Sequence, residues 1–402
     1  MADTKALQPP TGLKLATAAF VALWAVVAAF PLVWIVVMSF KLPLDAFAED
    51  PFQVLLGYQT MQERGGISAI AAITGLAAFI AALRVPAWLD YLAFTRMRAE
   101  RTRAGKIAAN AVLYLLLAAA AWWLFPALVR GLESIVATIP GGGFLARPLF
   151  GLTFEHYRAV WVDYGFYRNF INSLIITFGT VAISLTVGTL AGYGLARANS
   201  NLAFWILITA LIFRALPHSV LVTGYLPPFI NSREILMPLW DMPVLGTILH
   251  AFSDAPPTLY GQPLAVIMVL VSINQPFTIW MLRSFFQNIP TELDEAARVD
   301  GCSHFGAFWR VIMPVMWPGV ITTGLFSFLL AYNDYLVSSL LLDAQSQTMV
   351  PAITGFFNRE TTTTDQVQAV AAAVSITAPL FLLVMVFQKQ LVSGLMQGAV
   401  KG

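Results

Sequence analysis

The stretch that decides the fold is Leu15–Met38, "LATAAFVALWAVVAAFPLVWIVVM", which contains no charged residue. A helix needs about 20 apolar residues to cross the hydrocarbon layer of a bilayer, so this run predicts a membrane-spanning helix. It is too long for the apolar segment of a signal peptide, and no small-residue cleavage site follows it. The whole chain contains 58% hydrophobic and only 11% charged residues, which favours the same environment throughout. The sequence therefore predicts an all-α polytopic membrane protein.

Further apolar runs of similar length bring the expected number of spanning helices to about eight. Only one of these runs contains a charge, at Arg214. The runs are Ile67–Leu83, Ile107–Val129, Ile171–Ala196, Ala203–Leu226, Pro263–Leu282, Val311–Asn333 and Val367–Phe387.

The orientation follows from the Lys and Arg residues, which accumulate on the cytoplasmic side of membrane proteins. If both termini lie in the cytoplasm, fourteen of these residues lie inside and eight outside, with Arg214 within the membrane. The basic stretch Arg96–Lys106, "RMRAERTRAGK", contributes most of the difference. We interpret it as a topology anchor, and a partner site is the alternative.

A polar segment, Glu295–Pro314 ("EAARVDGCSHFGAFWRVIMP"), lies between two spans on the cytoplasmic side of this topology. Just before it, Thr291 is a candidate N-cap, and acidic residues occupy the first turn, where the helix dipole favours anions. Asp294 and Arg298 are one turn apart and can pair.

The same segment contains signals for a turn and a second helix. Gly301 can end the first helix, Ser303 can cap another, and Pro314 leads into the next span. The predicted product is a short helix, a turn and a second helix, a cytoplasmic knob suited to a groove on another protein. An ordinary loop helix is the simpler alternative.

Several motifs resemble the smaller, MalG-like permease subunit of carbohydrate-uptake ABC importers. The resemblance covers the first helix and most of residues 152–402. Two stretches depart from it, an inserted helical hairpin at about 48–150 and an enlarged outer loop at about 228–260. The motifs are "FPLVWIVVMSFK" (30–41), "NSLIITFGTVAISLTVGTLAGYGLAR" (172–197), "PFTIWMLRSFFQNIP" (276–290), "IPTELDEAARVDGCSHFGAFWRVIMPVMWPG" (289–319) and "GLMQGAVKG" (394–402).

The resemblance implies a domain organisation in which residues 1–47 form the N-terminal tail and first spanning helix. Residues 48–150 form the inserted hairpin with its basic cytoplasmic loop, and residues 151–402 form the permease core. The core includes the coupling loop at 290–314. Because two added helices return the chain to the side it left, we interpret the hairpin as an accessory, with a partner or regulatory contact as the alternative.

The resemblance also implies that the coupling loop docks in a cleft of an ATPase, with its glutamate facing basic residues. The chain has no GxxxxGK[ST] phosphate loop, so ATP and Mg are expected on two partner ATPase subunits and no cofactor on this chain. A second, MalF-like permease and a periplasmic substrate-binding protein complete the expected complex in the inner membrane. The residues assigned to ATPase coupling are Glu295, Ala296, Ala297, Asp300, Gly301, Pro314, Gly398 and Lys401.

The substrate path is predicted from polar residues within the apolar runs. A charge inside a membrane is costly, so Arg214 is a functional candidate, and Pro217 after it can break the helix near substrate. Amides, phenols and an acid suit sugar hydroxyls. The alternatives are a structural cation for Arg214 and membrane anchors for the tyrosines. The remaining candidates are Asn274, Gln275, Tyr332, Asn333, Asp334 and Tyr335.

Other classes of function find less support in the sequence. The net charge of +2 does not indicate a nucleic-acid partner, the single cysteine Cys302 excludes an internal disulfide, and the four histidines have no metal-like spacing. No acid–base or metal constellation suggests an intramembrane enzyme. We therefore expect an importer permease for a sugar or oligosaccharide, with a polyol, phosphorylated polyol or other solute as the alternative substrate and a membrane scaffold or signalling protein as the less favoured function.

Overall fold

The computed structural model describes residues 10–81, 123–198, 201–215, 218–243, 258–357 and 362–399, and the single positions 84, 112, 119 and 256. The chain forms two compact units. The N-terminal unit comprises residues up to Tyr157 together with 362–371, and the C-terminal unit comprises residues 158–361 and those from Ala372 onward.

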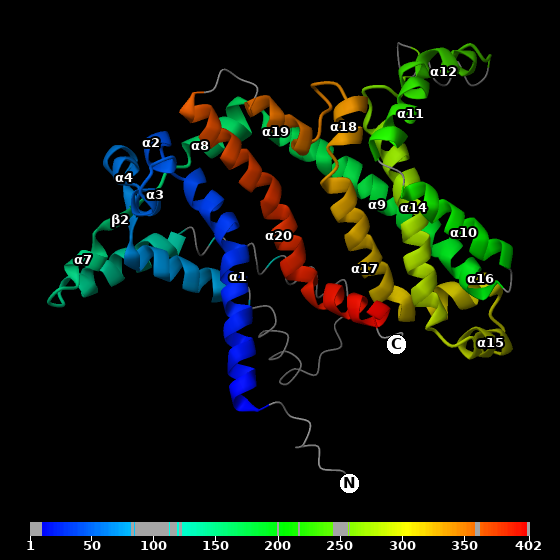
Figure 1. Cartoon of the computed structure of the whole chain (residues 1–402), viewed down its shortest axis with the longest axis horizontal. Coiled ribbons are helices and arrows are strands. Elements are labelled where there is room, and N and C mark those ends of the chain that lie inside the picture. Colours follow the sequence, from blue (N-terminus) through cyan, green and yellow to red (C-terminus); the bar gives the residue numbers. More distant parts are fainter. Residues whose placement is uncertain are drawn as a thin grey trace, which may run out of the picture. The chain divides into compact units, whose positions relative to one another are not determined.

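The N-terminal unit contains one long helix, several short ones and a two-stranded sheet (Figure 1). Two further helical segments, 69–81 and 123–137, follow β1 and precede α7. The elements are α1 (Thr11–Ser39), α2 (Pro43–Ala46), α3 (Pro51–Leu56), α4 (Tyr58–Arg64), β1 (Gly66–Ser68), α7 (Gly143–Ala146), β2 (Pro148–Gly151) and α8 (Glu155–Arg158).

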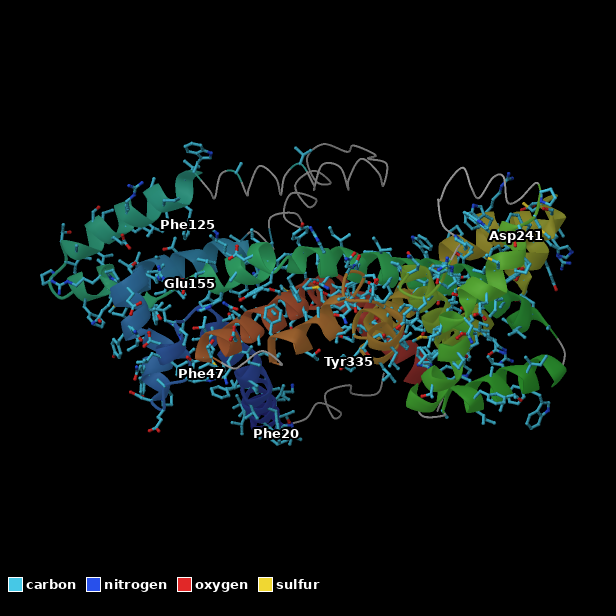
Figure 2. The ribbon with its side chains drawn as sticks, turned by 90° about the horizontal axis from the view of Figure 1, so that it is seen from above. Phe20, Phe47, Phe125, Glu155, Asp241 and Tyr335 are labelled. Carbon is cyan, nitrogen blue, oxygen red and sulfur yellow. The ribbon has the colours of Figure 1, made fainter. Side chains whose placement is uncertain are left out.

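The helix α1 is apolar around its whole circumference. Its residues Gly12–Ser39 form a candidate membrane span with none of the apolar window buried inside the chain. Figure 2 shows its exposed side chains, Phe20 among them. A helix that is hydrophobic on every side needs an apolar surrounding such as lipid or a neighbouring helix.

A buried polar cluster follows the end of α1 and organises the N-terminal unit. The ammonium of Lys41 donates to the carbonyls of Leu55, at 3.0 Å, and Gly151, at 2.6 Å. The carboxylate of Asp45 accepts from both the amide and the hydroxyl of Thr60, at 2.7 and 2.8 Å. Because buried polar groups are costly without partners, these bonds hold the short helices α2 to α4 against β2.

A small sheet lies within the predicted insertion, and the sequence did not predict it. β1 pairs with β2 in antiparallel fashion, with Gly66 opposite Gly151 and Ser68 opposite Pro148. The Ser68 hydroxyl also donates to Glu133, at 2.5 Å, in the returning helical segment. The two ends of the insertion are therefore hydrogen-bonded neighbours.

The C-terminal unit is built of helices. α9, α14 and α17 are its central elements, and α14 packs against both of the others. α20 begins in the N-terminal unit and continues into this one. The elements are η2 (Ala159–Asp163), α9 (Phe166–Arg197), α10 (Asn201–Arg214), α11 (His218–Ile230), α12 (Ser232–Trp240), α14 (Pro263–Gln287), α15 (Glu292–Val299), α16 (His304–Ala307), η3 (Phe308–Ile312), α17 (Met313–Tyr332), α18 (Leu336–Leu341), α19 (Met349–Phe357) and α20 (Thr363–Ala399).

Small residues let α9 and α14 approach closely. A Cβ atom added at Gly188 would lie 2.6 Å from the Cγ2 atom of Thr278, and one at Gly179 would lie 2.7 Å from the Cδ1 atom of Ile267. Such distances leave no room for a side chain. The small-residue pattern of α9 therefore serves helix packing, as it does in many membrane proteins.

The structure confirms an all-α polytopic fold and revises several predicted spans. Five described helices are long and apolar enough to cross a membrane: 12–39, 166–197, 263–287, 304–332 and 363–388. The predicted span Ala203–Leu226 is instead divided into α10 and α11, with α10 ending at Arg214 as expected for a break near Pro217. Most of Ile107–Val129 and the basic stretch 96–106 lie outside the described residues.

Because the ends of the insertion are paired, we expect the hairpin to be removable. Replacing residues 70–146 with a four-residue turn joins β1 to β2 as a hairpin and keeps the Lys41 cluster. The variant should still fold and copurify with its partner subunits. A variant that also carries Lys41→Met serves as the comparison, and failure of the turn variant to assemble would show that the hairpin is integral.

The buried ammonium of Lys41 predicts a pH dependence for the N-terminal unit. Burial lowers the pKa of Lys41 from 10.5 to about 8, although the Asp45 carboxylate acts to raise it. Between pH 8 and 10.5, Lys41 is protonated in the unfolded state but largely deprotonated in the folded state. The free energy of unfolding therefore rises with pH across this window. Below pH 8 the cost of burying the charged ammonium is fully present. Hydrogen exchange of residues 42–60, corrected for intrinsic rates, should slow from pH 7.5 to 9.5 in the wild type. The Lys41→Met variant should show no such change.

Candidate functional site

The predicted cytoplasmic knob is formed by α15, α16 and η3, which together join α14 to α17. Gly301 has a φ of +86°, a left-handed conformation that glycine adopts without strain and that ends α15. The Ser303 hydroxyl caps the next helix by accepting from the Gly306 amide, at 3.1 Å. Thr291 occupies the predicted N-cap position, although its side chain makes no capping hydrogen bond.

A buried ion pair connects this knob to the end of α9. The Arg197 guanidinium lies 2.7 Å from the Asp294 carboxylate, and both side chains are less than one-fifth exposed. Tyr193 donates to the other oxygen of the same carboxylate, at 2.6 Å. The prediction that Asp294 pairs with Arg298 was therefore wrong, because Arg197 and Tyr193 occupy both carboxylate oxygens.

Arg197 also binds the segment that connects α14 to the knob. Its two terminal nitrogens donate to the carbonyls of Phe286, at 3.3 Å, and Ile289, at 3.2 Å. These carbonyls lie at the end of α14 and just after it. One guanidinium therefore joins α9, the end of α14 and α15, using the fork of donors that distinguishes arginine from lysine.

Apolar packing completes the attachment of the knob. The buried residues come from α14, the residues just after it, η3 and α17. Tyr193 packs against the rings of Phe286 and Phe308, at centroid distances of 5.5 and 4.8 Å. A displacement of the knob must therefore move the membrane helices with it. The buried cluster comprises Leu282, Phe286, Ile289, Phe308, Ile312, Met316 and Val320.

The outer surface of the knob is exposed and partly apolar. Glu295 and Ala296 are exposed, whereas Ala297 is buried against the bundle. Three large apolar side chains nearby are also exposed, Val299 at 88%, Phe305 at 67% and Trp309 at 62%. Sequence reasoning did not single them out, although apolar residues in a polar segment were a usable signal. Exposed apolar groups of this kind are typical of surfaces that contact another protein or the membrane.

A cavity of about 300 Å³ opens beside this surface. It brings the exposed Glu295 and Arg298 together with the buried pair, so charged groups of both signs surround it. Its lining residues are Tyr193, Arg197, Thr291, Asp294, Glu295, Arg298, His304 and Ala307. A cavity of this size can receive a side chain of a docked partner.

The other predicted coupling residues are placed as follows. Asp300 and Gly301 are exposed at the end of α15, and Pro314 is the second residue of α17, as expected for the start of a span. Gly398 lies in the last turn of α20, and Lys401 lies outside the described residues.

The predicted path residues of α14 are buried between helices. The Asn274 amide donates to the Ser327 hydroxyl, at 2.8 Å, and the Gln275 amide contacts the Ser184 carbonyl, at 3.4 Å. The side-chain oxygens of both amides are buried, with no donor among the described residues. These amides therefore join α14 to α17 and to α9.

Three residues from the end of α17 form a separate cavity. Asn333, Asp334 and Tyr335 line a space of about 260 Å³ together with apolar residues of α14 and α18. The Asp334 carboxylate accepts from the Ser338 amide, at 2.8 Å, so it caps α18. Tyr332 instead is buried and donates to the Ile376 carbonyl, at 3.1 Å. The structure thus brings together three of the predicted path residues and places Tyr332 in the core.

Arg214 lies at the end of α10, against α14. Its guanidinium stacks over the ring of Phe277, with 4.5 Å from the Cζ atom to the ring centroid. A cation over an aromatic face is stabilised by the ring quadrupole.

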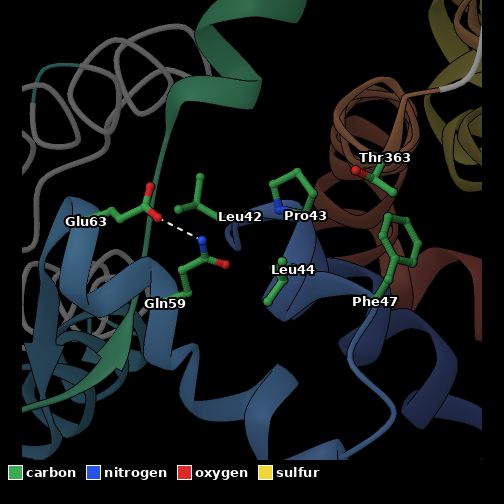
Figure 3. A pocket seen from close by; sticks show the side chains of 7 residues that line it. All are labelled: Leu42, Pro43, Leu44, Phe47, Gln59, Glu63 and Thr363. Carbon is green, nitrogen blue, oxygen red and sulfur yellow. Dashed lines mark hydrogen bonds between the residues drawn. The ribbon is translucent and has the colours of Figure 1, made fainter.

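The N-terminal unit contains a cavity of about 460 Å³ that sequence reasoning did not anticipate (Figure 3). One wall is apolar and includes Leu44 and Phe47, and the other holds Gln59, whose amide donates to Glu63 at 2.7 Å. No predicted site residue lines it.

The comparisons with known proteins define the class of this chain. Residues 184–397 match the family described as "Binding-protein-dependent transport system inner membrane component", and this match includes the knob, α14 and α17. The chain belongs to this family, so it is a membrane-embedded transport permease.

Among its relatives, the diacetylchitobiose uptake system permease protein DasC of Streptomyces coelicolor is 31% identical over 293 residues, covering 72% of this chain and 94% of DasC. The trehalose transport system permease protein SugB of Mycobacterium tuberculosis is 30% identical, covering 62% and 83% of the two chains. The sulfoquinovosyl glycerol transport system permease protein SmoH of Agrobacterium fabrum is 28% identical, covering 74% and 93%. A chain from a bacterial ABC transporter that imports alginate aligns with a TM-score of 0.45 and 18% identity, over 72% of this chain and 99% of that chain.

Removing the charge of Asp294 should loosen the knob. Asp294→Asn leaves the buried Arg197 cation without its counter-ion, and breaking a buried pair in this way costs about 3–5 kcal/mol. Hydrogen exchange of residues 292–301 should accelerate by at least about tenfold, while exchange in α9 and α17 changes little. Glu292→Gln, an exposed change on the same helix, is the control. Equal exchange in both variants would show that the pair does not hold the knob.

Proposed function

We propose that this permease is one of two membrane subunits of an ATP-driven importer for a sugar or oligosaccharide. A second, MalF-like permease would complete the translocation path, and two ATPase subunits would bind ATP and Mg. A periplasmic binding protein would deliver the substrate to the complex in the cytoplasmic membrane. The names of the relatives, which specify diacetylchitobiose, trehalose and sulfoquinovosyl glycerol uptake, support a glycoside as the substrate.

The knob is the element through which the ATPases would act. It presents Glu295 and three exposed apolar side chains outward, while Arg197 and Asp294 fix its inner face to the membrane helices. A partner that binds this surface more tightly in one conformation than in the other shifts the permease between them. This combination of an exposed outer face and a rigid inner attachment is the observation that carries the proposal.

The membrane topology follows from the proposed contact between the knob and the ATPases. With the knob in the cytoplasm, α9 runs inward, α10 and α11 run outward, and α14 returns to the cytoplasmic side. Gly398 and Lys401, in the C-terminal tail, would reach the ATPase from the same side. Asn333, Asp334 and Tyr335 then lie toward the outer face, where a binding protein releases its substrate.

Reversing the charge at Glu295 tests this coupling role. Because Glu295 is exposed, Glu295→Lys should leave the permease folded, but it would place like charge against basic residues in the ATPase cleft and weaken docking by several kcal/mol. Purified complexes should therefore lose ATPase subunits or lose uptake into vesicles. Glu292→Lys is the matched control, an equal charge change on the same helix that does not line the cavity.

The measurements are subunit stoichiometry, binding-protein-stimulated ATP hydrolysis and uptake. Normal values of all three in Glu295→Lys would refute coupling through the knob. Equal loss in both variants would mean that net charge, rather than contact at Glu295, is responsible.

A further inference from the structure

If α14 spans the bilayer as proposed, Arg214 lies near mid-depth in the membrane. Its contact residue Phe277 is fourteen residues after Pro263 and ten before Gln287 in α14. At about 1.5 Å per residue, Phe277 is about 21 Å from the outer end of the helix and about 15 Å from the inner end. The guanidinium above its ring therefore lies deep in a hydrocarbon layer about 30 Å thick.

The central helices supply no counter-ion for this charge. α9, α10, α11, α14 and α17 contain no aspartate or glutamate. Within the described part of the chain, Arg214 forms neither an ion pair nor a hydrogen bond, and its guanidinium stacks on Phe277. A guanidinium has five N–H donors at its edge, and stacking on a ring leaves all of them available. An uncompensated cation at this depth is costly, and the described part of the chain supplies no anion for it, so a bound ligand or a neighbouring subunit is the source to test.

Phe277 itself belongs to a small cluster of aromatic rings. The ring of Phe277 lies 6.2 Å from those of Trp280 and Phe326, tilted by 33° to the first and nearly perpendicular to the second. Trp280 is 45% exposed, so its ring is available to a ligand. A cation stacked on one ring of an aromatic cluster suits a ligand that has both an apolar ring face and a negative charge. A carboxylate from a neighbouring helix would pair with the guanidinium but would not stack on the aromatic rings.

Arg214 also lies at the end of one helix and close to the start of the next. α10 ends at Arg214 and α11 begins at His218, so the helix pair breaks beside the cation. Transporters bind substrate near the membrane midplane at such breaks, because the freed backbone groups can contact it.

We propose that Arg214, with Phe277, Trp280 and Phe326, forms a transit site for an anionic saccharide, whose carboxylate or sulfonate is bound by the guanidinium while a sugar ring stacks on the aromatic faces. This inference rests on the proposed function and specifies its substrate class. A carboxylate of the second permease is the rival partner, and the experiment distinguishes the two.

The first measurement identifies the preferred charge of the substrate. The partner binding protein is titrated with three matched pairs of disaccharides, of gluco, galacto and manno configuration, each as the neutral sugar and as the diuronate. The proposal requires tighter binding of the diuronate in at least one pair. Tighter binding of the neutral member in every pair would overturn it, whereas no binding of any saccharide would refute the proposed function itself.

The second measurement is ATP-driven uptake of the selected pair into vesicles containing the full complex. Arg214→Gln should lower uptake of the diuronate by at least about tenfold relative to the neutral sugar, since truncating one partner of a desolvated charge pair costs 2 kcal/mol or more. Arg214→Lys keeps the positive charge but loses the planar set of guanidinium donors. Its uptake of the diuronate should lie between that of the wild type and that of Arg214→Gln. Arg233→Gln removes an exposed arginine of α12 and should match the wild type.

Two results would overturn the proposal. If Arg214→Gln separates the two permeases, the anion belongs to the neighbouring subunit. If assembly is normal and both sugars are affected equally, Arg214 has a structural role rather than a role in recognition.

Discussion

The ion pair between Arg197 and Asp294 is the constraint on which the attachment of the knob depends. It joins residues 97 positions apart in sequence, and the same guanidinium holds two carbonyls at the end of α14. Without it, α15 would be attached mainly by the apolar contacts of η3. With it, the knob has a single orientation relative to α9 and α14, which is a condition for transmitting a partner's motion.

The inner face of the knob holds it in place, so the residues of the outer face are not needed for this attachment. Glu295, Val299 and Trp309 are exposed and contribute little to the packing of the knob. The two faces of α15 therefore differ: Asp294 forms the buried ion pair, whereas Glu295 is exposed. Asp294 and Glu295 are adjacent in sequence, yet the helix turns one toward Arg197 and the other outward.

The sequence predicted the elements of this fold better than their contacts. The apolar runs identified α1, α9, α14, α17 and α20, since membrane burial leaves a long and unambiguous pattern. The partner of Asp294 was mistaken because the helical spacing rule considers only neighbours on the same helix, whereas Arg197 arrives through tertiary packing. The β1–β2 pairing was missed because each strand is only three or four residues long. The substrate candidates were chosen by residue type and by their position in or near the apolar runs, which could not indicate that Tyr332 is buried while Asn333 and Tyr335 share a cavity.

The pairing of β1 with β2 has a consequence for how such chains can diverge. Since the sheet holds positions 68 and 148 side by side, the entropic cost of closing the intervening loop grows only slowly with its length. Residues between these positions can lengthen, shorten or acquire new binding surfaces without disturbing the register of α9 or the cytoplasmic knob. The small sheet therefore allows the segment between residues 68 and 148 to change in length or sequence while the sheet itself is kept.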